Sequence, residues 1–205
     1  MKKILPAFSY IFHPLFISVY AALFYLLISH RYFYGYEIVL IAVQVLILTV
    51  LLPVCVYYLL NSLGLIHSKM HLDKKERKLP LAIQAILLFI LLKQGFGNVT
   101  IQELHYYFTG YLISTLIALL CILLGYKASL HMMGVTSLTI FVISISAYYS
   151  LPMSAIIAFF ILCCGFTASS RLVMKAHTMD ELILGSLIGI LPQIGLWYMW
   201  LLPSL

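Results

Sequence analysis

The chain has 205 residues, of which 64% are hydrophobic and only 9% are charged, and its formal net charge is +6. Soluble domains carry roughly 25% charged and 45–50% apolar residues, so the composition excludes a soluble domain. We predict an all-α protein with a single integral membrane domain over residues 1–205. It is expected to be a polytopic transmembrane helix bundle of six to seven spans.

The predicted spans follow the apolar stretches along the chain, because a helix crosses the hydrocarbon core with about 20 apolar residues. The first stretch, 8–29, is too long for a signal-peptide core and has no small-x-small cleavage site, so we interpret it as a retained span. The other spans are expected at 38–60, 79–94, 104–126, 130–149, 151–168 and 180–202. Pro14, Pro53 and Pro192 fall inside these helices, which membrane helices tolerate.

Basic residues are divided unequally between the two faces that seven crossings define. One face holds Arg31 and Lys93 only, out of 12 Lys and Arg. The positive-inside rule therefore predicts that the other, basic face is cytoplasmic. That face holds Lys2, Lys3, Lys69, Lys74, Lys75, Arg77, Lys78, Lys127, Arg171 and Lys175.

The strongest chemical signal lies between the last two spans. His177 and Glu181 are four residues apart, which predicts that they stack on one helix face. A carboxylate there would hold the imidazole in one tautomer and raise its basicity, as a nucleophilic histidine requires. Arg171 adds a planar guanidinium suited to phosphate oxygens. Gly185 and Gly189 continue the same line and would let a neighbouring helix approach closely. The alternative is a short loop of basic interfacial anchors.

Two further clusters are predicted to lie at the same membrane face as the first one, because two membrane crossings separate each cluster from the next. Lys127, Ser129 and His131 stand at the mouth of the 130–149 span, where a histidine can also be a hydrogen-bonded structural residue. Phosphoryl transfer needs positioned positive charge, a nucleophile and an acid, and the three clusters together supply these. The third cluster, which could also be a solvated loop or an anionic-lipid contact, contains Lys74, Lys75, Arg77 and Lys78.

These residues resemble the type-2 phosphatidic acid phosphatase superfamily of membrane phosphatases, which shares its active site with vanadium haloperoxidases. The third motif of that superfamily is S-R-x5-H-x3-D. Here Ser170 and Arg171 are followed by five residues, His177, three residues and Glu181, so the match differs only in Glu for Asp.

The other motifs are more divergent. The second motif, P-S-G-H, corresponds to Ala-Ser-Leu-His at 128–131, and the first, K-x6-R-P, to the basic run that ends Arg-Lys-Leu-Pro at 77–80. The His-Pro-Leu at 13–15 and the stretch from Lys127 onward resemble a variant branch found in bacterial envelopes. The resemblance covers roughly residues 67–190 and implies a multi-pass protein of the bacterial inner membrane.

The resemblance also implies a mechanism, in which a membrane lipid phosphatase hydrolyses a lipid phosphate or pyrophosphate monoester through a phosphohistidine. His177 would attack phosphorus and Glu181 would orient it. His131 would protonate the leaving alkoxide and then activate water. The phosphate would be held by Arg171, Ser129, Lys127, Lys74, Lys75, Arg77 and Lys78.

The expected partners are membrane lipids and a lipid phosphate substrate, with no nucleic acid, no cofactor and no metal; the oligomeric state is left open. One alternative is a catalytically degenerate family member that binds lipid headgroups or a partner. Another is a transporter, whose site would lie near the membrane midplane between broken helices. The polar residues in the middle of the predicted spans are neutral, such as Gln44, Gln84, Ser114 and Thr115, whereas the ionisable residues lie at helix ends, which favours chemistry at an interface.

Overall fold

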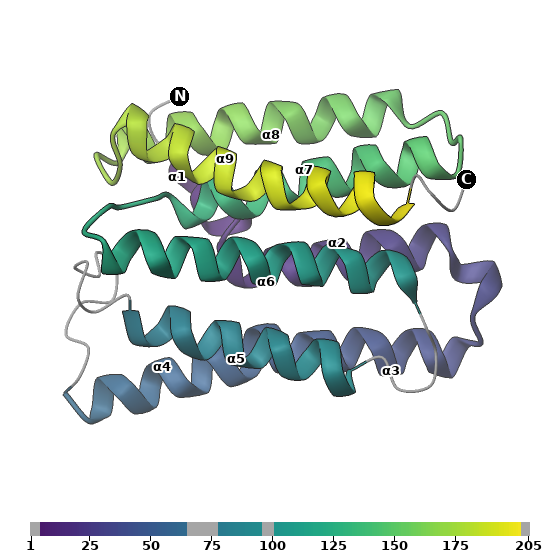
Figure 1. The fold of residues 1–205 in the computed structure, drawn as a ribbon, viewed down its shortest axis with the longest axis horizontal. Coiled ribbons are helices and arrows are strands. Elements are labelled where there is room, and N and C mark those ends of the chain that lie inside the picture. Colours follow the sequence, from purple (N-terminus) through teal and green to yellow (C-terminus); the bar gives the residue numbers. More distant parts are fainter. Residues whose placement is uncertain (1–4, 65–77, 96–100, 202–205) are drawn as a thin grey trace. The chain divides into compact units, whose positions relative to one another are not determined.

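The protein is represented by a computed structural model that describes residues 5–64, 78–95 and 101–201. Every regular element in these ranges is a helix, which confirms the predicted all-α class (Figure 1). The α-helices are α1 (Leu5–Ile11), α2 (Pro14–Ile28), α3 (Gly35–Leu46), α4 (Leu52–Ser62), α5 (Lys78–Gln94), α6 (Gln102–Leu123), α7 (Leu130–Tyr148), α8 (Ser154–Val173) and α9 (Met179–Leu196). Three short segments join or extend them: η1 (His30–Tyr32), η2 (Ile47–Leu51) and η3 (Trp197–Leu201).

Several of these helices are long and apolar enough to cross a membrane. Among the described residues there are five, or six if α1 and α2 form one bent span. The finer number of six to seven spans stays a prediction. Large apolar side chains are exposed along the outer helix faces, including Leu27 at 74% and Leu40 at 66%. Soluble monomers do not expose apolar surface on this scale, which indicates a membrane protein.

The prolines act differently from one another. Pro14 was predicted inside a helix, but it begins α2, and the axes of α1 and α2 differ by 67°. A proline inside a helix clashes with the carbonyl four residues earlier, and it disfavours the helical conformation of the residue before it. His13 therefore lies at a break between helices. Pro53 follows the π-helical turn η2 at the start of α4, and Pro192 lies inside α9 as expected.

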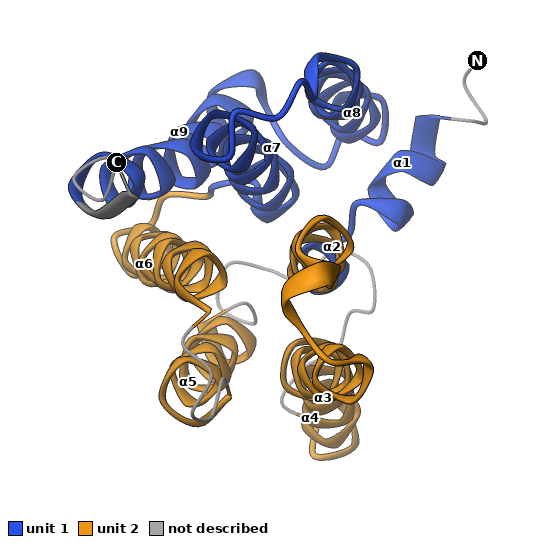
Figure 2. Ribbon diagram, turned by 90° about the vertical axis from the view of Figure 1, so that its right-hand side faces the viewer, with its two compact units in different colours: residues 1–17, 128–205 blue, residues 18–127 orange. Residues whose placement is uncertain are grey.

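The helices form two compact units (Figure 2). Unit 1 comprises Met1–Ile17 and Ala128–Leu205, and unit 2 comprises Ser18–Lys127. In unit 1, α7 packs against both α8 and α9, while α1 packs against α8. In unit 2, α5 packs against α6. The single-domain organisation stays a prediction.

Helices α7 and α9 approach each other closely at two glycines. A Cβ atom on Gly185 would collide with the backbone carbonyl of Ser129, and one on Gly189 with that of Met133. The backbone N–H of Ser129 donates a hydrogen bond to the carbonyl of Glu181 at 3.0 Å. The close helix approach expected from the two glycines is therefore present. It fixes the first turn of α7 against the first turn of α9.

Candidate active site

The turn between α8 and α9 separates two residues of the third motif. Helix α8 ends beyond Arg171, and Lys175 adopts a left-handed conformation with φ of 52°. Ala176 N–H donates to the carbonyl of Arg171 at 3.1 Å, and Lys175 N–H to that of Leu172 at 2.9 Å. This pair of bonds is a Schellman motif, which satisfies the last carbonyls of a helix. Arg171 thus belongs to the last turn of α8, whereas His177 lies in the connection.

His177 and Glu181 are paired, as the sequence predicts, but not because they stack on one helix. Helix α9 begins at Met179, so His177 precedes it, and Thr178 is its N-cap. Glu181 closes a capping box, in which its N–H donates to Thr178 Oγ1 and its Oε2 accepts from Thr178 N–H, both at 3.4 Å. The same Oε2 lies 2.6 Å from His177 Nδ1. The prediction that the two residues stack on one helix face is therefore wrong. The capping box places the Glu181 carboxylate beside the His177 ring.

This geometry also gives a physical reason for a glutamate, and not an aspartate, at position 181. In a capping box the third helical residue must reach back to the N-cap backbone, and glutamate or glutamine has the length to do so. Here one oxygen of Glu181 serves both the cap and the histidine. With Nδ1–H of His177 donated to this carboxylate, Nε2 is the basic nitrogen of the ring. The His177 side chain is 2% exposed and that of Glu181 22%.

His131 lies in the first turn of α7, whose N-cap is Ser129. Ser129 is completely buried, and its Oγ accepts from Met132 N–H at 3.5 Å. His131 Nε2 lies 3.1 Å from the backbone carbonyl oxygen of Ser9. Because a carbonyl can only accept, Nε2 carries a proton. Arg171 and His177 both lie close enough to act electrostatically on His131.

The N-terminal segment contributes residues that the sequence analysis did not place in the site. Ser9 Oγ and Ser170 Oγ are 2.6 Å apart, and both serines are buried. The rings of His13 and His131 meet edge to face, with centroids 5.2 Å apart. His13 also lies within electrostatic range of Arg171. The only signal in the sequence was the histidine before Pro14, and the structure shows that the helix breaks there.

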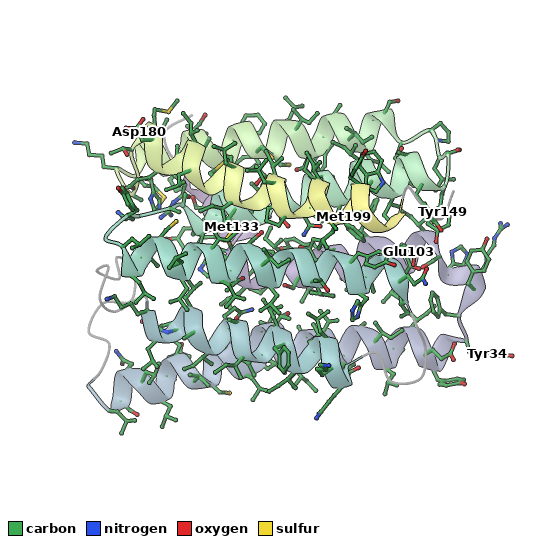
Figure 3. The ribbon with its side chains drawn as sticks, viewed as in Figure 1. Tyr34, Glu103, Met133, Tyr149, Asp180 and Met199 are labelled. Carbon is green, nitrogen blue, oxygen red and sulfur yellow. The ribbon has the colours of Figure 1, made fainter. Side chains whose placement is uncertain are left out.

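Unit 1 therefore gathers residues from four segments at one end of its helices. They come from α1, the start of α7, the end of α8 and the start of α9 (Figure 1). In Figure 3, Asp180 marks this end of the unit and Tyr149 the opposite one. The predicted site residues found together here are Ser129, His131, Arg171, His177 and Glu181.

The remaining predicted phosphate ligands belong to unit 2 or lie outside the described residues. Lys78 begins α5 and Lys127 follows α6, so both lie at the same end of unit 2, opposite to Lys93 at the end of α5. This agrees with the predicted segregation of positive charge within that unit. The last three, Lys74, Lys75 and Arg77, lie outside the described residues.

The residues gathered in unit 1 are those that resemble the second and third superfamily motifs in sequence. Their geometry adds a histidine–carboxylate pair and a second, hydrogen-bonded histidine to the sequence resemblance. Membership of the superfamily is a proposal that rests on these residues, because no family model, no curated protein and no solved structure matches the chain.

Proposed function

We propose that unit 1 carries the active site of a lipid phosphatase, which hydrolyses a lipid phosphate or pyrophosphate monoester without a metal ion. The observation that supports this most directly is the buried His177, held by Glu181 at 2.6 Å through Nδ1. A histidine oriented in this way presents a basic Nε2, which is what a nucleophile needs. His131 and the buried Arg171 provide an acid–base group and a positive charge near it.

The first half of the reaction transfers the phosphoryl group to the protein. The lone pair of His177 Nε2 attacks phosphorus, and the bond between phosphorus and the lipid oxygen breaks. Protonated His131 gives its proton to that oxygen, so the lipid leaves as an alcohol, or as a monophosphate when the substrate is a pyrophosphate. Arg171 stabilises the negative charge on the equatorial phosphate oxygens.

The second half releases phosphate. Water attacks phosphorus and gives one proton to His131, which the first half left neutral. The bond between phosphorus and Nε2 breaks, and its electron pair returns to the His177 ring. Inorganic phosphate leaves, and both histidines regain their starting protonation states. Glu181 stays ionised throughout, because its role is to hold Nδ1–H and stabilise the charged ring.

The substrate class and the metal independence can be tested together. Among the described residues, no group of three or more His, Cys, Asp or Glu side chains is arranged to hold a metal ion. We expect the purified protein in mixed micelles to release phosphate from at least one member of a panel of lipid mono- and diphosphates. The rate should be unchanged by excess chelator.

Two outcomes of this assay would contradict the proposal. Loss of activity in chelator, with rescue by a divalent cation, would show a metal-dependent mechanism. Binding of lipid phosphates without any phosphate release would favour the alternative, a family member that binds lipid headgroups without turnover.

We also propose that the site faces the cytoplasm from a bacterial inner membrane, on the basis of the charge distribution. Lys175 and Ser150 are both exposed and flank opposite ends of α8. In a variant without the four native cysteines, Lys175→Cys should resist an impermeant thiol reagent in intact cells, whereas Ser150→Cys should react. Lys175→Cys should react in inverted vesicles, and both variants should react after permeabilisation. The reverse pattern in intact cells would contradict this orientation.

A further inference from the structure

The N-terminal segment makes polar and aromatic contacts with the proposed acid–base histidine. The carbonyl of Ser9 accepts the proton of His131 Nε2 at 3.1 Å. The His13 ring packs against the His131 ring at a centroid distance of 5.2 Å and an interplanar angle of 86°. Neither contact is used in the steps described above. Together they restrain His131 at one ring nitrogen and at one side of the ring.

Both contacting groups are themselves fixed in place. Helix α1 is held on α8 by the buried bond between Ser9 and Ser170, and by stacking of Phe8 on Phe166 with centroids 4.8 Å apart. The backbone N–H of Leu15 donates to His13 Nδ1 at 3.3 Å, at the start of α2. The His13 ring is therefore anchored where proline breaks the chain's first apolar stretch, and it does not depend on His131 for its position.

We propose that His13 is a positioning residue for His131, acting together with the Ser9 carbonyl; this inference rests on the proposed function. With Nε2–H engaged by Ser9, the proton that protonated His131 gives to the leaving oxygen is the one on Nδ1. Donation from Nδ1 requires the ring to hold one rotation about its Cβ–Cγ bond. The edge-to-face contact with His13 sets that rotation. A hydrogen bond from one ring nitrogen to a fixed carbonyl is a general way to orient an imidazole.

Helix packing alone does not require a histidine at position 13. Phe8 and Phe12, of which Phe12 is buried, supply apolar contacts in this segment. A residue that acts only on packing would affect every substrate to the same extent. A residue that positions a general acid matters most when the leaving group is a poor one, because such a group needs a proton as its bond breaks.

The experiment measures the rate of phosphoenzyme formation by rapid quench, with two substrates in detergent micelles. One is an alkyl lipid phosphate with a poor leaving group, and the other is an aryl phosphate with a good one. We expect His13→Ala to slow the alkyl reaction by about tenfold, which is less than the loss of about 10²–10⁴-fold expected when a general acid is removed completely. The aryl reaction should change by less than about twofold, by the same reasoning. His13→Phe retains an aromatic ring and should restore most of the alkyl rate.

Several outcomes would overturn the inference while leaving the proposed function intact. One is a His13→Ala protein that forms phosphoenzyme from both substrates at the wild-type rates. Another is an equal loss with both substrates, which would show a structural role only. A third is a His13→Phe variant as slow as His13→Ala. His105→Ala, on α6 in unit 2, is the matched control and should react like wild type. A wild-type protein that forms no phosphoenzyme from either substrate would instead overturn the proposed function.

Discussion

Replacing His177 by alanine should abolish both turnover and the covalent phosphoenzyme, because it removes the nucleophile itself. Replacing His131 should slow turnover by about 10²–10⁴-fold, which is the usual effect of losing a general acid or base. His131→Ala should still form phosphoenzyme from a substrate with a good leaving group. Glu181→Gln should fall between the two, because glutamine can retain the backbone contact of the capping box but lacks the charge that stabilises the His177 ring. Phosphate release, and radiolabel retained on the protein after an alkaline quench, measure these effects.

The interpretation of these variants depends on their folding. Each should unfold within a few degrees of wild type in detergent, since none changes the α7–α9 contact. His30→Ala, an exposed histidine in η1, is a control that should keep full activity. Equal rates of lipid phosphate release from wild type, His177→Ala, His131→Ala and Glu181→Gln would show that the catalytic assignment is wrong.

Adding one methyl group at Gly185 should damage both the fold and the site. The new Cβ would collide with the carbonyl of Ser129, which is backbone and cannot move aside as the end of a flexible side chain can. Overpacking of this kind typically costs about 1–3 kcal/mol. Separating the helices would also stretch the Ser129–Glu181 backbone bond of 3.0 Å, which ties the His131 turn to the His177 pair. We therefore expect Gly185→Ala to lower both the unfolding temperature and the rate of phosphate release.

Gly195 provides the matched control on the same helix. A Cβ atom there would meet no atom within 4 Å, and the position is helical. Alanine is favoured over glycine in a helix interior by about 1 kcal/mol, so Gly195→Ala should be neutral or stabilising and fully active. Thermal unfolding and phosphate release, measured on both variants, compare the two positions. If Gly185→Ala were as stable and as active as Gly195→Ala, the close α7–α9 contact would not support the site.

The helices could be predicted from the sequence because their cause is local. Apolar stretches without charge lead to helices in a membrane, where backbone groups must bond within their own segment. The break at Pro14 has a physical cause, because proline and the residue before it both disfavour a continuing helix. Pro192 has the same chemistry but lies inside α9, so the local sequence does not by itself decide between a break and a tolerated proline.

Part of the site was also predictable, because motif spacing encodes local geometry. The Thr178 to Glu181 capping box is a recognisable pattern, and it explains why His177 meets its carboxylate just outside a helix. The contacts of α1 were not predictable in this way. Ser9 and His131 are 122 positions apart, and Ser9 and Ser170 are 161 apart. Spacing in one sequence says nothing about contacts between such distant segments.

The most direct test of the proposed phosphatase is to locate the covalent intermediate. Purified protein would be mixed with a radiolabelled lipid phosphate, quenched within milliseconds, digested and mapped by mass spectrometry under alkaline conditions. A phosphohistidine is base-stable and acid-labile, and the proposal predicts that it lies on His177 and is absent from His177→Ala. Lipid phosphate hydrolysis with no phosphate on His177, or with phosphate on another residue, would contradict it.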